Sequence, residues 1–284
     1  MSESQKVLQL PVWRTVKAAY LVIFHNPGLA LKLALIPLTL TLLSSMATAW
    51  LFAGSNVEQL AQDPGWMIFG AGSTIIVYGS MIPTITAWHR LVLLGHDRLD
   101  ARIGYSIRAS EWLYLWKGFV FILIMFLISI PTIVLIALIG GVVGALGTAA
   151  EGNVSAPVFV VVITGVALVA NVFLYGFVLR FNLVFPSAAI GKPMGFGESW
   201  RRTRGNTWRL FVIAFVTVFP FMVFPMLISA ALFGFQQIPS IENQVLSSLI
   251  HTPFWILGLC VGISFWSWAY RYLVQEMPIL LPDE

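Results

Sequence analysis

Long stretches without a charged side chain recur along this sequence. They cover residues 33–57, 64–88, 118–150, 152–179, 210–241 and 243–270. A helix needs about 20 apolar residues to cross the hydrocarbon core of a bilayer, and each stretch is long enough to supply one. A transmembrane β-strand would instead alternate polar and apolar residues over about ten positions. The stretches therefore predict an all-α, polytopic membrane protein with six spans.

The composition agrees with this class. Hydrophobic residues make up 58% of the chain and charged residues 10%, whereas soluble domains contain roughly 45–50% apolar residues. No secretory leader is expected, because the apolar patch at 18–24 is short and leads into the sequence HNPG. We predict a single integral membrane domain over residues 1–284, with spans near 33–53, 66–88, 118–148, 157–179, 210–235 and 249–270.

The basic residues lie on one side of these predicted spans. All 16 Lys and Arg fall in the N-terminal segment, in the stretches 89–117 and 180–209, and in the C-terminal tail. The short loops at the other span ends contain acidic residues but no Lys or Arg. Because membrane proteins concentrate Lys and Arg in cytoplasmic loops, we expect both termini to be cytoplasmic. The pI of 9.4 is then a consequence of topology, and no nucleic-acid partner is expected.

Three similar units follow one another along the chain. Each contains an aromatic and basic stretch, a span, a short outer loop, a second span and a basic exit with a Leu-Val pair. We interpret each unit as a hairpin preceded by a cytoplasmic interfacial helix. The alternative is that any hairpin with basic cytoplasmic ends has this appearance. The units cover roughly 1–95, 96–190 and 191–284, and the Leu-Val pairs lie at 91–92, 183–184 and 273–274.

Proline and glycine inside the spans indicate close helix packing. Proline is tolerated in a membrane helix where neighbours bond the backbone groups that it frees. Two GxxxG matches let helices approach closely, and we expect them to pack within the chain rather than in a dimer. The prolines are Pro37, Pro83, Pro131, Pro220, Pro225 and Pro253, and the glycines are Gly140, Gly144, Gly258 and Gly262.

Groups that carry out chemistry are scarce in the spans. The spans contain no Asp, Glu, Lys or Arg away from their ends, although ion pumps and proton relays usually need such a group. We interpret His251 as an interfacial residue and Asn171 as a hydrogen-bonding residue between helices, with a polar transport path as the alternative for Asn171. His89, His96 and Asp97 lack the spacing of a zinc motif and are expected in a solvated loop. We therefore expect no enzyme, no cofactor and no metal.

The sequence SWRRTRGNTWRLF at 199–211 is the densest basic cluster. Tryptophan prefers the depth of the lipid headgroups, and a guanidinium group pairs with phosphate through two parallel hydrogen bonds. We expect residues 195–209 to lie in the interface as an amphipathic helix, with Gly205 and Asn206 turning the chain into the fifth span. The cluster is either a general anchor or a specific site for an anionic headgroup or solute. The predicted lipid-contacting residues are Trp200, Arg201, Arg202, Arg204, Trp208, Arg209, Lys32 and Lys117.

The arrangement of LVFPSAAIG followed by SWRRTRGNTWRLF resembles a group of six-span bacterial inner-membrane proteins. The group includes the multi-pass membrane domain attached to some glycerophosphodiester phosphodiesterases. The resemblance covers residues 180–211 and implies a bacterial inner membrane but no reaction, since the phosphodiesterase activity belongs to a separate soluble barrel. The matching positions are Pro186, Ser199, Trp200, Thr203, Gly205, Asn206, Trp208 and Arg209.

Two functional hypotheses follow from these features. The first is a non-enzymatic membrane protein whose basic cytoplasmic face binds anionic lipid or a membrane-protein partner. The second is a transporter or channel for a small solute or a lipid, motivated by the repeated hairpins and the prolines in the spans. A structure without a polar cavity that reaches the middle of the membrane would exclude the second hypothesis.

Overall fold

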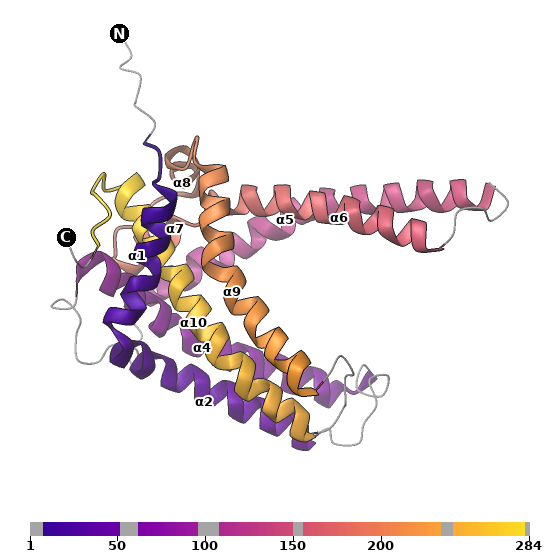
Figure 1. Ribbon diagram of the computed structural model, residues 1–284, viewed down its shortest axis with the longest axis horizontal. Helices are drawn as coiled ribbons and strands as arrows, with labels where there is room; N and C mark the ends of the chain where they lie inside the picture. The colour runs from indigo at the N-terminus through magenta and orange to yellow at the C-terminus, as the bar shows by residue number, and fades with distance from the viewer. Residues whose placement is uncertain (1–7, 52–61, 96–107, 150–155, 234–240, 282–284) are drawn as a thin grey trace, which may run out of the picture.

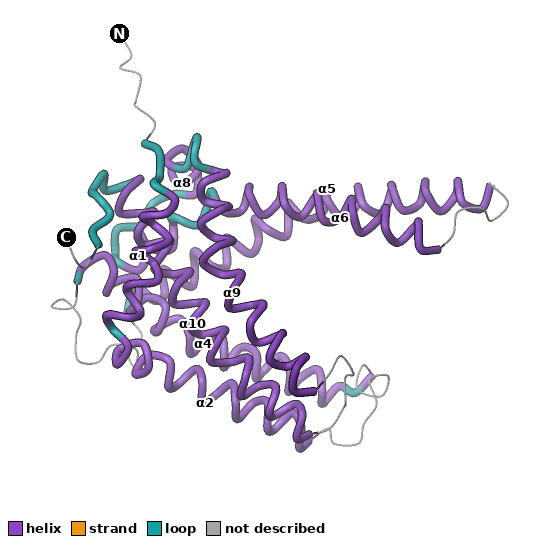
Figure 2. Tube along the Cα trace, viewed as in Figure 1, coloured by secondary structure: helices purple, strands orange, loops and turns teal. Residues whose placement is uncertain are grey.

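The chain folds into helices joined by turns and short loops (Figure 1). The computed structural model describes residues 8–51, 62–95, 108–149, 156–233 and 241–281, and no strand occurs among them (Figure 2). The helices are α1 (Val12–His25), α2 (Pro27–Leu51), α4 (Pro64–Leu94), α5 (Ala109–Ala149), α6 (Ala156–Leu179), α7 (Val184–Ala189), α8 (Phe196–Arg202), α9 (Thr207–Phe233) and α10 (Ile241–Leu273).

The prediction of an all-α protein with six spans is confirmed. Six segments are long and apolar enough to cross a membrane: Pro27–Leu51, Pro64–Leu94, Ala109–Val142, Thr164–Ala189, Thr207–Leu232 and Leu246–Leu273. Helices α4 and α5 are among those that extend further toward the basic residues than predicted. Arg90 lies near the end of α4 and Glu111 near the start of α5. The two side chains form an ion pair, so both charges are compensated and both helices continue through them.

Two groups of helices diverge from a shared region, formed by α1, α7, α8 and the adjoining ends of the longer helices, which we call the base (Figure 1). The four-helix arm contains α2, α4, α9 and α10, and α10 packs against the other three. The two-helix arm contains α5 and α6, which pack against each other. Helix α1 packs against α9 and α10 at the base, where the short helices α7 and α8 also lie. Apart from Lys17 in the middle of α1, the described Lys and Arg residues lie near the helix ends and in the turns of this base.

The three Leu-Val pairs meet in the core of the base. Leu91, Val92, Leu183, Val184 and Leu273 belong to one buried cluster, and Val274 packs against it. Residues that are far apart in the sequence therefore contribute to a single core, which fixes the ends of α4, α7 and α10 relative to each other. Burial of apolar side chains of this size is worth about 1.5–3 kcal/mol each.

Helix α10 satisfies two polar side chains of α4 within the base. Trp88 Nε1 donates a 2.8 Å hydrogen bond to Ser264 Oγ. His89 Nδ1 lies 2.7 Å from Ser267 Oγ, and both side chains are buried. The expectation that His89 lies in a solvated loop is therefore wrong, because α4 continues to Leu94. His96 and Asp97, which were expected in the same loop, lie outside the described residues.

Two prolines leave a backbone carbonyl of their own helix without its usual N–H donor. Hydroxyl groups of neighbouring helices donate to these carbonyl groups instead. Pro37 has no N–H to donate to the carbonyl of Leu33, and Thr84 Oγ1 of α4 donates to that oxygen over 2.9 Å. Pro220 likewise has no N–H to donate to the carbonyl of Val216. This carbonyl accepts a hydrogen bond from Tyr20 Oη of α1. The prolines in α2 and α9 are thus satisfied from outside their own helices, which is how membrane helices tolerate this residue.

Two of the four predicted packing glycines lie against α9. A Cβ atom added to Gly258 would lie 2.8 Å from the Cβ of Phe221, and one added to Gly262 would lie 3.7 Å from Val218 Cγ2. Gly258 therefore allows α9 and α10 to approach closely. Gly140 lies in α5 and is partly buried. Gly144 lies in the same helix, but its surroundings are outside the described part of the structure.

The three units differ at their starts. Separate helices precede the first and third units: α1 ends at His25 before α2, and α8 ends at Arg202 before α9. The second unit has no separate helix over 109–117, because this stretch is the first part of α5. The threefold relationship thus stays a prediction, supported by the shared core of the Leu-Val pairs and by equivalent prolines in α2, α5 and α9.

Candidate functional site

The basic cluster forms a turn between α8 and α9. Helix α8 contains only seven residues and ends at Arg202. Gly205 has a φ of 78°, in the left-handed region that favours glycine. Asn206 follows this turn, and its backbone carbonyl accepts the first hydrogen bond of α9 from Leu210 N over 2.8 Å. The expected turn at Gly205 and Asn206 is therefore present, while the interfacial helix before it is shorter than the predicted stretch 195–209.

Arg180 at the end of α6 holds α8 in place. Its guanidinium carbon lies 3.4 Å from the centre of the Trp200 ring, and its Nη2 donates to the Trp200 carbonyl over 2.6 Å. Ser199 Oγ donates to the Arg180 carbonyl over 2.7 Å. Thr203 Oγ1 lies 3.3 Å from both the Arg180 Nε and its carbonyl oxygen. Ser199, Trp200 and Thr203, which are matching positions of the resemblance, therefore all contact Arg180, which is not one of those positions.

Asn206 and Arg209 hold the N-terminal segment. Leu10 N donates to Asn206 Oδ1 over 2.8 Å, and Asn206 Nδ2 donates to the Leu8 carbonyl over 2.7 Å. The Asn206 amide thus pairs with the backbone of this segment through both of its polar atoms. Arg209 adds hydrogen bonds to the Leu10 carbonyl and to Gln9 Oε1. These two members of the cluster therefore bind protein, and sequence reasoning did not foresee it.

The remaining arginines of the cluster divide into two kinds. Arg202 Nη1 lies 3.2 Å from Glu276 Oε1, and Arg202 Nε lies 3.9 Å from Glu198 Oε1. The charge of Arg202 is therefore compensated by two carboxylates. Arg201 and Arg204 are exposed and make no side-chain hydrogen bond or ion pair with any described residue. Arg204 also acts electrostatically on Arg180, which has no carboxylate partner among the described residues. The site therefore has an excess of positive charge at Arg180, Arg201 and Arg204.

The other predicted lipid-contacting residues lie around the same base. Trp208 is 70% exposed and stacks on Phe211, with ring centroids 5.4 Å apart. Lys117 Nζ lies 5.4 Å from the centre of the Phe196 ring at the start of α8. Lys32 is exposed near the start of α2. Lys117 therefore contacts α8, the helix in which the cluster begins, and Lys32 lies elsewhere at the base.

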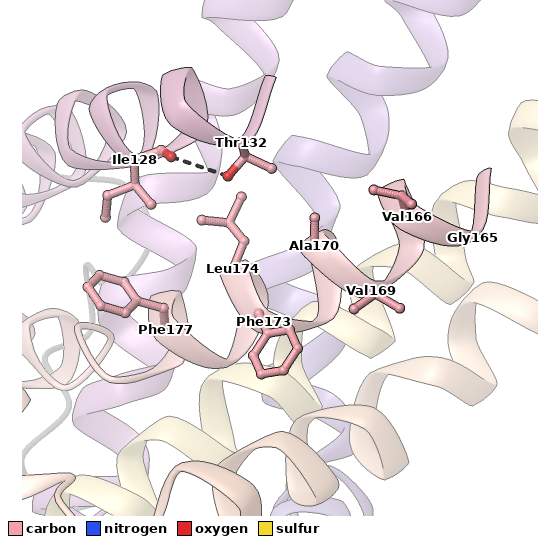
Figure 3. A pocket seen from close by; sticks show the side chains of 9 residues that line it. All are labelled: Ile128, Thr132, Gly165, Val166, Val169, Ala170, Phe173, Leu174 and Phe177. Atoms are coloured by element: carbon pink, nitrogen blue, oxygen red, sulfur yellow. Dashed lines mark hydrogen bonds between the residues drawn. The ribbon is translucent and has the colours of Figure 1, made fainter. Parts of the chain in front are cut away.

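An apolar groove leads to this cluster along the two-helix arm (Figure 3). Its volume is about 620 Å³, and its walls come from α5 and α6. The hydroxyl of Thr132 donates to its own helix at the Ile128 carbonyl, so the one polar side chain among the residues drawn is internally satisfied. Phe177 lies at one end of the groove, and its ring packs on Trp200 with centroids 4.5 Å apart. The groove therefore ends beside Trp200, on whose ring the uncompensated Arg180 lies.

A buried ion pair joins the two arms near the base. Arg90 Nη2 lies 3.0 Å from Glu111 Oε1, with side-chain exposures of 13% and 3%. Arg90 also donates to the Ala189 carbonyl of α7 over 2.8 Å and bonds the Ser110 hydroxyl. The second carboxylate oxygen accepts the Arg108 backbone N–H over 2.8 Å, as a glutamate in the first turn of a helix does. The spacing of Glu111 after Arg108 was the only sequence signal for this arrangement.

A cavity of about 530 Å³ lies within the four-helix arm. All four helices of the arm line it, and many of its side chains carry hydroxyl groups. His251 also lines the cavity and bonds the Ser247 carbonyl of its own helix over 2.8 Å. A second pocket, of about 330 Å³, lies nearer the base and shares Phe221, Met222 and Trp255 with the cavity. These features were not identified from the sequence, which showed the hydroxyl residues only as scattered positions.

Asn171 has a different role from the one predicted. Its Nδ2 donates to the Ala167 carbonyl one turn earlier in α6 over 2.8 Å, and the residue is exposed. The prediction of a hydrogen bond between helices is therefore wrong, because the amide of this residue bonds its own helix. Among the described residues, no group of three or more His, Cys, Asp and Glu is placed to hold a metal ion.

The fold and the site define a polytopic α-helical membrane protein whose described Lys and Arg residues lie in one region, the base. Comparisons with family models, with curated proteins and with solved structures found no match to this chain.

Proposed function

We propose that this chain is a non-enzymatic bacterial inner-membrane protein whose base binds an anionic phospholipid. The observation that carries the proposal is the contact of Phe177, at the end of the apolar groove, with Trp200, on which the uncompensated Arg180 lies. The groove suits an acyl chain, while Arg201 and Arg204 suit a phosphate group. Anionic phospholipids carry both parts in one molecule.

Electrostatics favours a phosphate at this position. Arg180 and Arg204 act on each other as like charges, and no described carboxylate compensates them. A lipid phosphate would remove this repulsion. Each basic residue near an anionic membrane surface gains about 1 kcal/mol from the surface potential, and close contact adds charge-assisted hydrogen bonds.

The contacts reduce the set of residues that would bind the headgroup. Arg202 is paired with glutamates and Arg209 with the N-terminal segment, so both have structural partners. Trp200 is covered on one face by Arg180. Arg201 and Arg204 are then the principal phosphate ligands, and the exposed Trp208 inserts at headgroup depth.

The orientation in the membrane is part of the same proposal. We place the base on the cytoplasmic side, because it contains the Lys and Arg residues and positive loops stay in the cytoplasm. The test uses single cysteines introduced as Lys192→Cys at the base and Asp63→Cys at the start of α4, in a Cys260→Ser background. A membrane-impermeant maleimide should label only the variant at position 63 in intact cells. Labelling of position 192 alone would reverse the orientation.

Lipid binding is tested by native mass spectrometry of protein purified in a mild detergent. Wild-type protein should retain phosphatidylglycerol, and the double variant R201Q/R204Q should retain at least threefold less. The matched control is R202Q, which removes a cation that already has carboxylate partners and should have little effect. Equal retention by the wild type and the double variant would reject Arg201 and Arg204 as ligands.

A transporter or channel is the second candidate function. The cavity in the four-helix arm favours it, because hydroxyl groups from these spans line it. The cavity and the second pocket follow one another along the arm toward the base. Uptake of a solute into proteoliposomes, compared with protein-free liposomes, tests this candidate independently of lipid retention.

A further inference from the structure

We propose that the cavity of the four-helix arm binds an uncharged polyhydroxylated group, such as a sugar or another polyol. The cavity lies among helices that cross the membrane, where a polar surface is costly unless something bonds to it. Its volume of about 530 Å³ is within the range of about 300–1,000 Å³ found for small-molecule sites. The inference is independent of lipid binding at the base, and it names a ligand class for the transport candidate.

Free hydroxyl groups are the first observation that supports this ligand class. Thr252 of α10 is only 5% exposed, yet its hydroxyl makes no hydrogen bond with a described residue. The hydroxyl of Ser44 on α2 is also without a bond to the described residues, and so is that of Thr74 on α4. Each can donate one hydrogen bond and accept two. Three helices therefore present unused hydrogen-bonding groups to one space.

Other hydroxyl groups of the wall donate to backbone carbonyls of their own helix and can therefore only accept a hydrogen bond from a ligand. Thr41 Oγ1 donates to the Pro37 carbonyl over 2.7 Å, and Ser45 Oγ donates to the Thr41 carbonyl over 2.9 Å. Their protons are thus used within α2, while their oxygen lone pairs remain free. A ligand for this wall must both donate and accept hydrogen bonds, as a hydroxyl group does.

The described walls of the cavity disfavour ionic ligands, because Tyr78 and His251 are their only ionisable side chains. No Asp, Glu, Lys or Arg occurs among the described residues that line the cavity. An ion moved into such a site would lose its hydration without gaining a counter-charge, which is strongly unfavourable. An uncharged polyol avoids this cost, because each of its hydroxyl groups can exchange a water for a protein partner.

Aromatic side chains provide a surface for the apolar face of a sugar ring. Tyr78 and Trp255 form an edge-to-face pair at the cavity, with ring centroids 6.1 Å apart. Both are exposed, together with Met222, so the cavity opens at the side of the arm. A polyol could therefore come from a dissolved solute or from the sugar headgroup of a neutral glycolipid.

The test measures binding of two uncharged probes to the purified full-length chain in nanodiscs. The probes are radiolabelled glucose and monoglucosyl-diacylglycerol, with glucose 6-phosphate as the charged comparison. Wild-type protein should bind at least one uncharged probe saturably, and glucose 6-phosphate at least tenfold more weakly. Binding of glucose supports a dissolved ligand, whereas binding of the glycolipid alone supports a lipid-borne sugar.

Conservative variants connect the binding to the cavity. Ser44→Ala and Thr252→Val each remove one free hydroxyl while keeping a similar shape, and each should weaken binding about threefold or more. The matched control is Ser129→Ala on α5, which lies outside the cavity and should bind as the wild type does. Helical content measured by circular dichroism separates a binding defect from misfolding.

Two results would overturn the inference. One is the lack of saturable binding of both uncharged probes to folded wild-type protein. The other is unchanged binding in both cavity variants. Binding without uptake into proteoliposomes would support this site and contradict the transport candidate. The lipid-retention measurement on R201Q/R204Q does not depend on any of these outcomes.

Discussion

Tyr20 Oη of α1 donates a 2.9 Å hydrogen bond to the carbonyl oxygen of Val216 in α9. This carbonyl is the one that Pro220 leaves without a donor in its own helix. Burial raises the pKa of Tyr20, so the phenol remains a donor at neutral pH and above. A short helix at the base therefore completes the backbone of a spanning helix and connects the N-terminal segment to the four-helix arm.

Removal of this hydroxyl should destabilise the protein in a proline-dependent manner. We expect Tyr20→Phe to lower the free energy of unfolding by about 0.6–1.7 kcal/mol, as for other hydrogen bonds between membrane helices. Pro220→Ala restores the missing N–H, so Tyr20→Phe should cost little in that background. Thermal unfolding in detergent measures all four combinations. Equal costs in both backgrounds would show that the hydrogen bond does not compensate the proline.

The contacts of Asn206 predict a structural role for the basic cluster. Asn206→Ala removes the hydrogen bonds to Leu8 and Leu10 and should destabilise the protein by about 1–3 kcal/mol. The N-terminal segment should also become susceptible to limited proteolysis. The control is Asn171→Ala, since Asn171 is exposed and bonds only its own helix. Similar proteolysis rates in both variants would contradict this role.

The buried ion pair between Arg90 and Glu111 should be sensitive to loss of one partner. Glu111→Gln leaves a buried guanidinium without its counter-charge, and such changes cost about 3–5 kcal/mol. The exposed pair between Arg202 and Glu276 is the comparison, and Glu276→Gln should cost at most about 1 kcal/mol. Urea or thermal unfolding gives both values, and a similar cost for the two changes would argue against a special role for the buried pair.

Close packing of α9 and α10 at Gly258 predicts intolerance of a larger residue. Gly258→Ala places a Cβ atom 2.8 Å from Phe221 Cβ and should destabilise the protein by about 1–3 kcal/mol. Gly79→Ala is the matched control, because an added Cβ at that position meets nothing within 4 Å. Melting temperatures that fall equally in the two variants would mean that the approach of the helices does not matter.

The sequence was sufficient to predict the class and the spans, because long uncharged runs have few other stable solutions. Pro37 and Pro220 could also be expected to need external donors, but Thr84 and Tyr20 could not be identified. These donors lie 47 and 200 positions away along the chain, so only the packing of the helices brings them together. Local patterns contain no such information.

The basic cluster shows the same limit at the level of the site. Density of arginine and tryptophan suggested a lipid surface, yet Asn206 and Arg209 contact the N-terminal segment. The four residues Arg201, Arg202, Arg204 and Arg209 look alike in sequence, and their roles separate only through their neighbours. Similarly, the hydroxyl groups of Ser44 and Thr252 line the same cavity only because α2 and α10 pack together.

The proposed lipid site is tested most directly by photo-crosslinking. A phosphatidylglycerol with a diazirine in one acyl chain is incorporated into nanodiscs with the protein, and labelled residues are identified by mass spectrometry. We predict that labelling concentrates in the groove at 128–132 and 165–177, and that R201Q/R204Q reduces it at least threefold relative to R202Q. Labelling spread evenly over the spanning helices, and unaffected by the double variant, would contradict a specific site at the base.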